Sequence, residues 1–206
     1  MYHNGDRYAE NFDKVDVELK FATKPDFWDS AAKGQYVIPR GKGMYPHGQF
    51  DCGCIYASAP IEADGKLWIY YMGGNGPHTG FRETSFARGY LEKDKFAGYV
   101  QQRKDAPGKI VTSHFCVYGD SLSVLAEIGE KGYVKVGLGT KDGAVYPGFE
   151  LDSCVLERQE EGYYKVCFPN HAISELRTRP VSVHFVFEDA KIYAFRGDLE
   201  CQMLKY

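Results

Sequence analysis

The sequence lacks any long stretch with the pattern of an α-helix. No segment combines a 3.6-residue hydrophobic period with capping residues, and the best candidates, residues 25–32 and 173–177, are one or two turns long. The chain is instead rich in glycine, with 23 residues, and in tyrosine, with 16. This composition is typical of short strands joined by tight turns. We therefore expect an all-β fold.

Runs of basic residues and long apolar runs are also missing. The 25 lysines and arginines are scattered, the formal net charge is -3, and no apolar run approaches the length of a membrane span. The polar start, residues 1–7, lacks the pattern of a signal peptide, and there is no Asn-x-Ser/Thr sequon. We expect a soluble, cytoplasmic protein that binds neither nucleic acid nor membrane and takes neutral or weakly charged ligands.

The six cysteines are too sparse for a disulfide scaffold. Most of them lie inside apolar, strand-like runs, which predicts reduced residues of the core. The alternative is a zinc site built from Cys52, Cys54, His47 and His114. A Cys-x-Cys spacing is too short for a zinc knuckle, and no residue is placed as a base beside a cysteine nucleophile. We expect no metal and no cofactor.

The glycine-rich residues 73–80 lack the features of a dinucleotide-binding loop. The full G-x-G-x-x-G spacing is missing and no helix is expected to follow, which excludes that class of site. Two interpretations of this segment remain. It is either a structural turn or a substrate-binding rim in which His78 and Arg82 donate hydrogen bonds.

The stretch from Gln49 to Gly74 predicts a β-hairpin. The dipeptide Asp64-Gly65 supplies the positive φ angles of a tight turn, and strand-like residues lie on both sides of it. Asp51 then lies at the start of one strand and residues 73–80 at the end of its neighbour, which is the same end of an antiparallel pair. A carboxylate, His78 and Arg82 could converge there. Alternatively, Asp51 only caps backbone N–H groups at a turn.

Composition divides the chain near residues 103–109, its most linker-like segment. Before this point, residues 15–23 alternate apolar and charged residues, the pattern of one half-buried strand. After it we expect seven short strands, as in a β-sandwich: residues 110–115, 121–128, 133–138, 153–156, 163–168, 181–187 and 191–196. In the segment 181–187 the odd positions form the buried face, so His184 should point outward. We expect two domains, residues 1–108 and 109–206.

Several segments of the chain are similar to one group of proteins: residues 38–43, 50–53, 60–61, 64–74 and 86–98. They resemble the late blades of five-bladed β-propeller glycoside hydrolases and phosphorylases. More closely, they resemble a bacterial glycosyl-hydrolase-like group in which a β-sandwich follows the propeller, and residues 148–154 and 181–195 are similar to that sandwich. The resemblance implies a partial β-propeller, of one blade and part of another, followed by an antiparallel β-sandwich.

The resemblance also implies roles for particular residues. Asp51 matches an acidic position facing the propeller funnel, and His78 lies on the same rim. We expect Asp51 to be catalytic; the expected substrate-binding residues are His47, Trp68, Tyr71, His78 and Arg82. One carboxylate cannot supply the acid and base or nucleophile of glycoside cleavage, so cleavage would require a larger assembly. A lone blade exposes an apolar face and sheet edges, which predicts a second copy or a partner chain.

Two hypotheses on function follow from these observations. The first is a carbohydrate-associated protein of the propeller glycoside-hydrolase type that contributes to cleavage only within an assembly. The second is a non-catalytic sugar-binding or assembly module. Such a module would expose aromatic platforms such as Trp68, Tyr70 or Tyr71 without a pair of acids.

Overall fold

The computed structural model describes residues 13–24 and 26–201, and these residues form an all-β protein of several antiparallel sheets. Its helices are 3-10 turns: η1 (Leu151–Ser153), η2 (Glu160–Gly162) and η3 (Ile173–Leu176). Within the described residues, therefore, no helix is long enough to cross a membrane. The turn predicted at residues 173–177 is confirmed. The turn predicted at residues 25–32 is wrong, because the strand β3 (Phe27–Ser30) lies there.

The chain divides into two compact units between Ala97 and Gly98. This division precedes the predicted boundary at residues 108–109. The difference arises because β9 (Tyr99–Val100) pairs with β14 (Ser182–Cys201) and so belongs to the second unit. The polar start of the chain lies outside the described residues.

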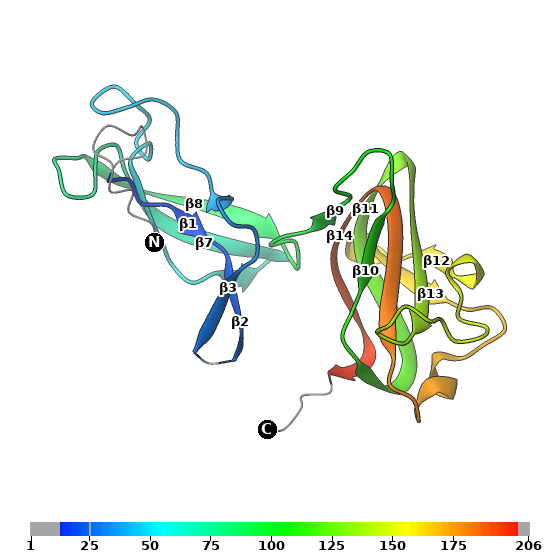
Figure 1. Cartoon of the computed structure of the whole chain (residues 1–206). Helices are drawn as coiled ribbons and strands as arrows, with labels where there is room; N and C mark the ends of the chain where they lie inside the picture. Colours follow the sequence, from blue (N-terminus) through cyan, green and yellow to red (C-terminus); the bar gives the residue numbers. More distant parts are fainter. Residues whose placement is uncertain (1–12, 25, 202–206) are drawn as a thin grey trace. The chain divides into compact units, whose positions relative to one another are not determined.

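The first unit is built on a four-stranded antiparallel sheet of β5 (Cys54–Ala57), β6 (Ile61–Ala63), β7 (Lys66–Gly74) and β8 (Thr84–Glu92). β5 and β6 pair one after the other with the same edge of β7. β8 pairs with the other edge of β7 over its full length (Figure 1). The predicted hairpin turn is confirmed, since Asp64 and Gly65 join β6 to β7 with φ angles of 53° and 69°. The predicted pairing of the two strands is therefore present, and β7 is the central strand of the sheet.

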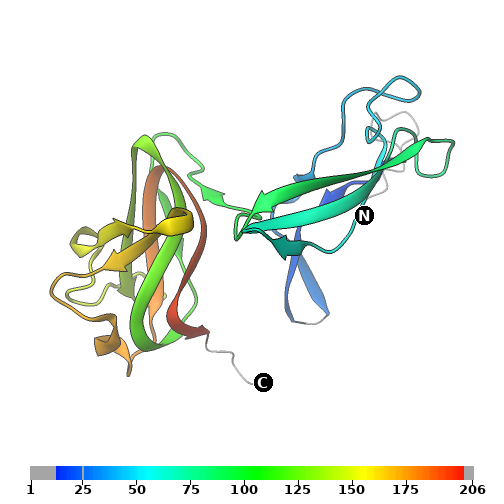
Figure 2. The ribbon, with the colours of Figure 1, turned by 180° about the vertical axis from the view of Figure 1, so that it is seen from behind.

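Two small strand pairs complete the first unit. β1 (Val17–Glu18) pairs with β4 (Tyr36–Ile38), and β2 (Lys20–Lys24) pairs with β3. In Figure 2 the β2–β3 hairpin, in blue, points away from the four-stranded sheet. The single strand predicted over residues 15–23 is wrong, because its two halves pair with different partners.

Glu18 links these two small strand pairs. Its carboxylate accepts hydrogen bonds from Ser30 Oγ (2.6 Å) and from the Gly34 N–H (3.0 Å), and it lies 3.1 Å from Lys20 Nζ. The Ser30 hydrogen bond, followed by the Lys20 hydrogen bond, lowers the pKa of Glu18 from 4.5 to about 2. A carboxylate whose pKa is lowered by folding stabilises the fold above its unfolded pKa. That contribution is lost as the pH falls from about 4.5 toward 2.

We expect acid to weaken the first unit partly through Glu18. Between about pH 7 and pH 3, the melting temperature of the first unit should fall further in the wild type than in Glu18→Gln, because glutamine has no charge to lose. Calorimetry of both proteins at each pH measures the difference. Equal falls in the two proteins would show that the Glu18 charge does not stabilise the fold.

The second unit is a single antiparallel sheet of six strands in the order β10–β14–β11–β13–β12, with β9 paired to β14. Its remaining strands are β10 (Gly108–Val111), β11 (Phe115–Gly139), β12 (Val155–Arg158) and β13 (Tyr163–Cys167). β11 and β14 are long and curved, green and orange to red in Figure 1. Buried residues from both halves of β11, such as Val124 and Val136, belong to one hydrophobic cluster with Phe185 of β14. The curved sheet therefore packs against one hydrophobic core.

Two sequence-based expectations for the second unit are wrong. The glycines near residues 119, 129 and 132 do not end strands, because β11 continues through them with irregular register. Four predicted short strands are thus parts of β11 and β14. The odd positions of residues 181–187 belong to the core, as predicted, but His184 on the other face is not exposed. It is buried, and its Nε2 lies 2.8 Å from the Thr140 carbonyl oxygen. Since a carbonyl only accepts, this nitrogen donates the hydrogen bond.

Candidate functional site

We call the face of the four-stranded sheet that carries the buried Ile69 and the half-buried Tyr71 of β7 the covered face. Asp51 lies on this face. It is 7% exposed, and Tyr71 Oη donates a hydrogen bond of 3.0 Å to its Oδ2. A Cβ added to Gly73 would come within 2.6 Å of both Asp51 Cβ and the Phe50 ring, so Gly73 leaves the space that Asp51 occupies. Burial, followed by the Asp51 hydrogen bond, raises the pKa of Tyr71. Tyr71 therefore remains a protonated donor to this carboxylate at neutral pH.

Two further aspartates are buried in the first unit. Asp13 Oδ2 accepts hydrogen bonds from the backbone N–H (2.8 Å) and Oγ1 (2.5 Å) of Thr79, and Asp16 pairs with Arg40 Nε at 2.5 Å. Buried carboxylates need such partners, and these ones fasten residues 13–16 to neighbouring loops. Neither residue was predicted from the sequence pattern. The alternating pattern indicated that Asp16 is a solvent-facing charge.

His78 and Arg82 lie at the same end of the sheet as Asp51 but on its other face. Arg82 Nη1 donates to the carbonyl oxygens of Pro77 (3.2 Å) and His78 (2.5 Å), which braces the loop between β7 and β8. A Cβ added to Gly74 would lie 2.8 Å from Arg82 Cδ. Because Gly73 and Gly74 are adjacent in β7, their Cβ positions point to opposite faces. The sheet therefore separates Asp51 from Arg82.

His47 and the two neighbouring cysteines occupy separate environments. His47 is exposed in the loop of residues 40–49. Cys52 Sγ donates to the Asn75 carbonyl oxygen at 3.1 Å, and Cys54 Sγ to that of Gly76 at 3.4 Å. Burial raises the pKa of Cys54, which favours the thiol over the nucleophilic thiolate. All six cysteines are free, and Cys116 and Cys201 are exposed, so Cys116 is not the core residue that its position predicted.

The uncovered face of the four-stranded sheet carries a row of aromatic side chains. The strand register places Trp68 beside Tyr90 and Met72 beside Phe86, and Tyr70 lies between them on β7. Phe86 is 84% exposed, Tyr90 53% and Tyr70 46%. We call this surface the aromatic face; its residues are Lys66, Trp68, Tyr70, Phe86, Arg88 and Tyr90.

Two cations lie over rings of the aromatic face. Lys66 Nζ is 4.1 Å from the centre of the Tyr90 ring, and the Arg88 guanidinium carbon is 4.6 Å from the centre of the Trp68 ring. The two rings are themselves 5.2 Å apart. Cations are attracted to the electron-rich faces of aromatic rings, so these contacts hold the side chains in an ordered group. Of the residues predicted to bind substrate, only Trp68 belongs to this group.

Comparison with known proteins adds no relative. No protein-family model, curated protein or solved structure matches this chain. The arrangement of side chains therefore carries the functional argument, and the resemblance to propeller hydrolases stays a prediction.

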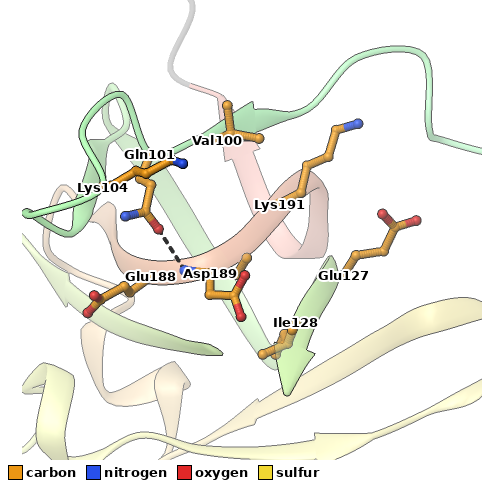
Figure 3. A pocket seen from close by; sticks show the side chains of 10 residues that line it. Val100, Gln101, Lys104, Glu127, Ile128, Glu188, Asp189 and Lys191 are labelled. Atoms are coloured by element: carbon orange, nitrogen blue, oxygen red, sulfur yellow. Dashed lines mark hydrogen bonds between the residues drawn. The ribbon is translucent and has the colours of Figure 1, made fainter. Parts of the chain in front are cut away.

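The second unit has a hollow of about 660 Å³ beside the irregular middle parts of β11 and β14 (Figure 3). Its charged lining is mixed: Lys104, Glu127, Glu188, Asp189 and Lys191. Gln101 Oε1 accepts a hydrogen bond of 2.6 Å from the Asp189 N–H, which ties the loop after β9 to β14. No aromatic residue lines this hollow.

A metal centre is not among the candidates in the described part of the chain. Within residues 13–24 and 26–201, no three His, Cys, Asp or Glu side chains gather in a group that could hold a metal ion. The aromatic face is thus a surface of the first unit on which exposed rings and cations lie in contact with one another.

Proposed function

We propose that this protein is a carbohydrate-associated β-module that binds glycan through the aromatic face. The observation that carries this proposal is the exposure of Phe86, Tyr90 and Tyr70 along one face of the sheet. Pyranose rings present apolar C–H faces, which stack on aromatic rings, and hydroxyl groups around their rims, which bind polar and charged side chains. An open row of rings with cations among them suits an extended sugar chain.

The geometry favours binding over cleavage. Asp51 is buried on the covered face, and its described polar contact is the hydrogen bond from Tyr71. Glycoside cleavage normally uses two carboxylates flanking the bond that breaks. Asp51 is therefore assigned a structural role, in which it orients Tyr71 and the start of β5.

The resemblance noted in the sequence extends this proposal. The four-stranded sheet would correspond to one blade of a propeller and the curved sheet of the second unit to the sandwich that follows it. The free thiols of all six cysteines agree with a cytoplasmic location. In an assembled propeller, carboxylates for cleavage would come from another chain.

Substitutions of exposed rings test the proposal directly. We expect Phe86→Ala and Tyr70→Ala to leave the melting temperature nearly unchanged, because these rings are exposed. Each should weaken binding of glycan oligosaccharides, screened by glycan array and quantified by titration calorimetry, by roughly tenfold.

Two control variants make this test specific. Tyr118→Ala removes an exposed ring of the second unit. Asp51→Asn keeps the size of a side chain on the covered face and one oxygen that can accept from Tyr71. Both should retain wild-type binding. If Asp51→Asn abolishes binding while the ring variants retain it, the ligand contacts the covered face and the proposal is wrong.

A second candidate function is assembly, favoured by the free edge of β8. Among the described residues β8 pairs only with β7, so alternate residues along its outer edge present backbone groups without a strand partner. A second copy or a partner chain could extend the sheet there and cover the aromatic face. Light scattering during the titration separates the two functions: glycan binding by a monomer favours the first, and a stable dimer that the Phe86→Ala substitution dissociates favours the second.

A further inference from the structure

We propose that the glycan bound by the aromatic face is anionic, a chain of uronic acid sugars. This inference rests on the proposed function and names its ligand class. It comes from the charges of the aromatic face, which differ in sign from the net charge of -3 of the whole chain.

Lys66 and Arg88 are the cations of this face, and their described contacts are to rings. Lys66 lies over Tyr90 and Trp68, and Arg88 lies over Trp68. Neither forms an ion pair in the part of the chain that the structure describes. The two positive charges are thus available to a ligand.

The carboxylates near the aromatic face are paired with other cations. Glu92 lies opposite Lys66 in the strand register but pairs with Lys95. Glu62 of β6 lies opposite Leu67, so its side chain belongs to the other face of the sheet, and it pairs with Lys93. These lysines follow β8 and neutralise the two acids. The strands therefore present Lys66 and Arg88 as the cations without a carboxylate partner beside the exposed rings.

The geometry of Arg88 suits a carboxylate. The Arg88 guanidinium lies over the Trp68 ring and forms no ion pair among the described residues, so its N–H groups can donate hydrogen bonds to a ligand. A carboxylate can accept two such bonds from one guanidinium. Phe86 and Tyr70 lie on the same face as Arg88, so a uronate could stack on a ring while its carboxylate meets the guanidinium.

A pair of matched ligands tests this inference. Titration calorimetry compares an oligogalacturonate with the same oligomer whose carboxyl groups are methyl esters, which removes the charge and retains the sugar rings. We expect the acid to bind more tightly, with a loss of about two- to fivefold for each cation removed in Arg88→Gln and Lys66→Gln. Raising the salt concentration from about 20 to about 300 mM should reduce the difference in binding affinity between the acid and the ester.

The outcomes distinguish this inference from the proposed function. Arg88→Gln should bind acid and ester with more similar affinities, whereas Lys109→Gln, which removes an exposed cation of the second unit, should keep the wild-type preference. Equal binding of both ligands by the wild type, insensitive to salt, would overturn the anionic ligand and leave the glycan-binding proposal intact. If the protein binds only uncharged glycans, the anionic ligand is likewise overturned and the glycan-binding proposal is kept. Failure to bind either oligomer or any arrayed glycan would overturn both.

Discussion

Gly53→Ala should lower the melting temperature of the first unit by on the order of 15 °C. A Cβ at residue 53 would come 2.0 Å from the carbonyl oxygen of Gly76 and 2.8 Å from its nitrogen. Both atoms belong to the backbone, so no change of rotamer relieves the clash. Overpacking of this kind costs typically 1–3 kcal/mol, and we place Gly53 near about 3 kcal/mol.

The effect of Gly53→Ala should extend through the end of the sheet. The Gly53 N–H donates to the Gly74 carbonyl oxygen at 2.9 Å, and its own carbonyl accepts from the Val15 N–H at 3.2 Å. Moving residue 53 would therefore disturb the contact between the N-terminal segment and β5. Calorimetry that resolves the melting of the two units would show the loss in the first unit alone.

Gly89→Ala provides the matched control. Gly89 also lies in the four-stranded sheet, but a Cβ built there meets nothing within 4 Å, and its φ angle is an ordinary one. Alanine at this position should leave stability unchanged or raise it by about 0.5–1 kcal/mol, because glycine weakens a strand interior. If Gly53→Ala melts as Gly89→Ala does, the close approach of residues 53 and 76 is not part of the native structure.

Phe149→Ala should destabilise the second unit by about 3–5 kcal/mol. Phe149 is 2% exposed, and its ring lies 5.0 Å from the Phe168 ring and 5.4 Å from the His171 ring. Its carbonyl oxygen accepts a hydrogen bond from the Leu138 N–H, so the ring is held against the end of β11. Truncation would leave a cavity beside the Phe168 and His171 rings, which cannot move far enough to fill it.

Chemical denaturation that resolves the unfolding of each unit measures the loss of unfolding free energy in Phe149→Ala. Tyr118→Ala, which removes an exposed ring of β11, should change stability by no more than about 0.5 kcal/mol. The first unit should melt as in the wild type, because Phe149 lies wholly within the second compact unit. An equal loss of unfolding free energy in both units would mean that they unfold together, which contradicts their division into two compact units.

Local sequence signals predicted the all-β class and the hairpin turn at residues 64–65. Asp64-Gly65 specifies its hairpin because both residues adopt positive φ angles, a property of the two residues themselves. The same local approach failed at β11 and β14. Glycine is compatible with both a turn and an irregular strand, and only the long partner strand decides between them.

The candidate site was predicted only in part, because the faces of a sheet depend on its neighbours. Trp68, Tyr70 and Tyr71 were predicted as possible exposed platforms; Tyr70 is exposed, whereas Trp68 and Tyr71 are half-buried. Phe86 and Tyr90 were not predicted. Their signal was present in the sequence: Phe86, Arg88 and Tyr90 alternate with the small or apolar residues Ala87, Gly89 and Leu91. Sequence could not reveal that Asp51 and Arg82 lie on opposite faces, since that follows from the β7 register. His184 was misplaced for a similar reason, because Thr140 covers its side of β14.

The position of β14 in the curved sheet has a consequence for synthesis of the chain. β14 lies between β10 and β11 and also pairs with β9, and all three of these strands precede it in the sequence. While the protein is being translated, those strands leave the ribosome before the strand that joins them has been made. The residues of the ladder nearest each other along the chain are Gly139 and Ser182, so closing the ladder from this end costs the least loop entropy. The second unit therefore completes its sheet only when nearly all of its described residues have emerged.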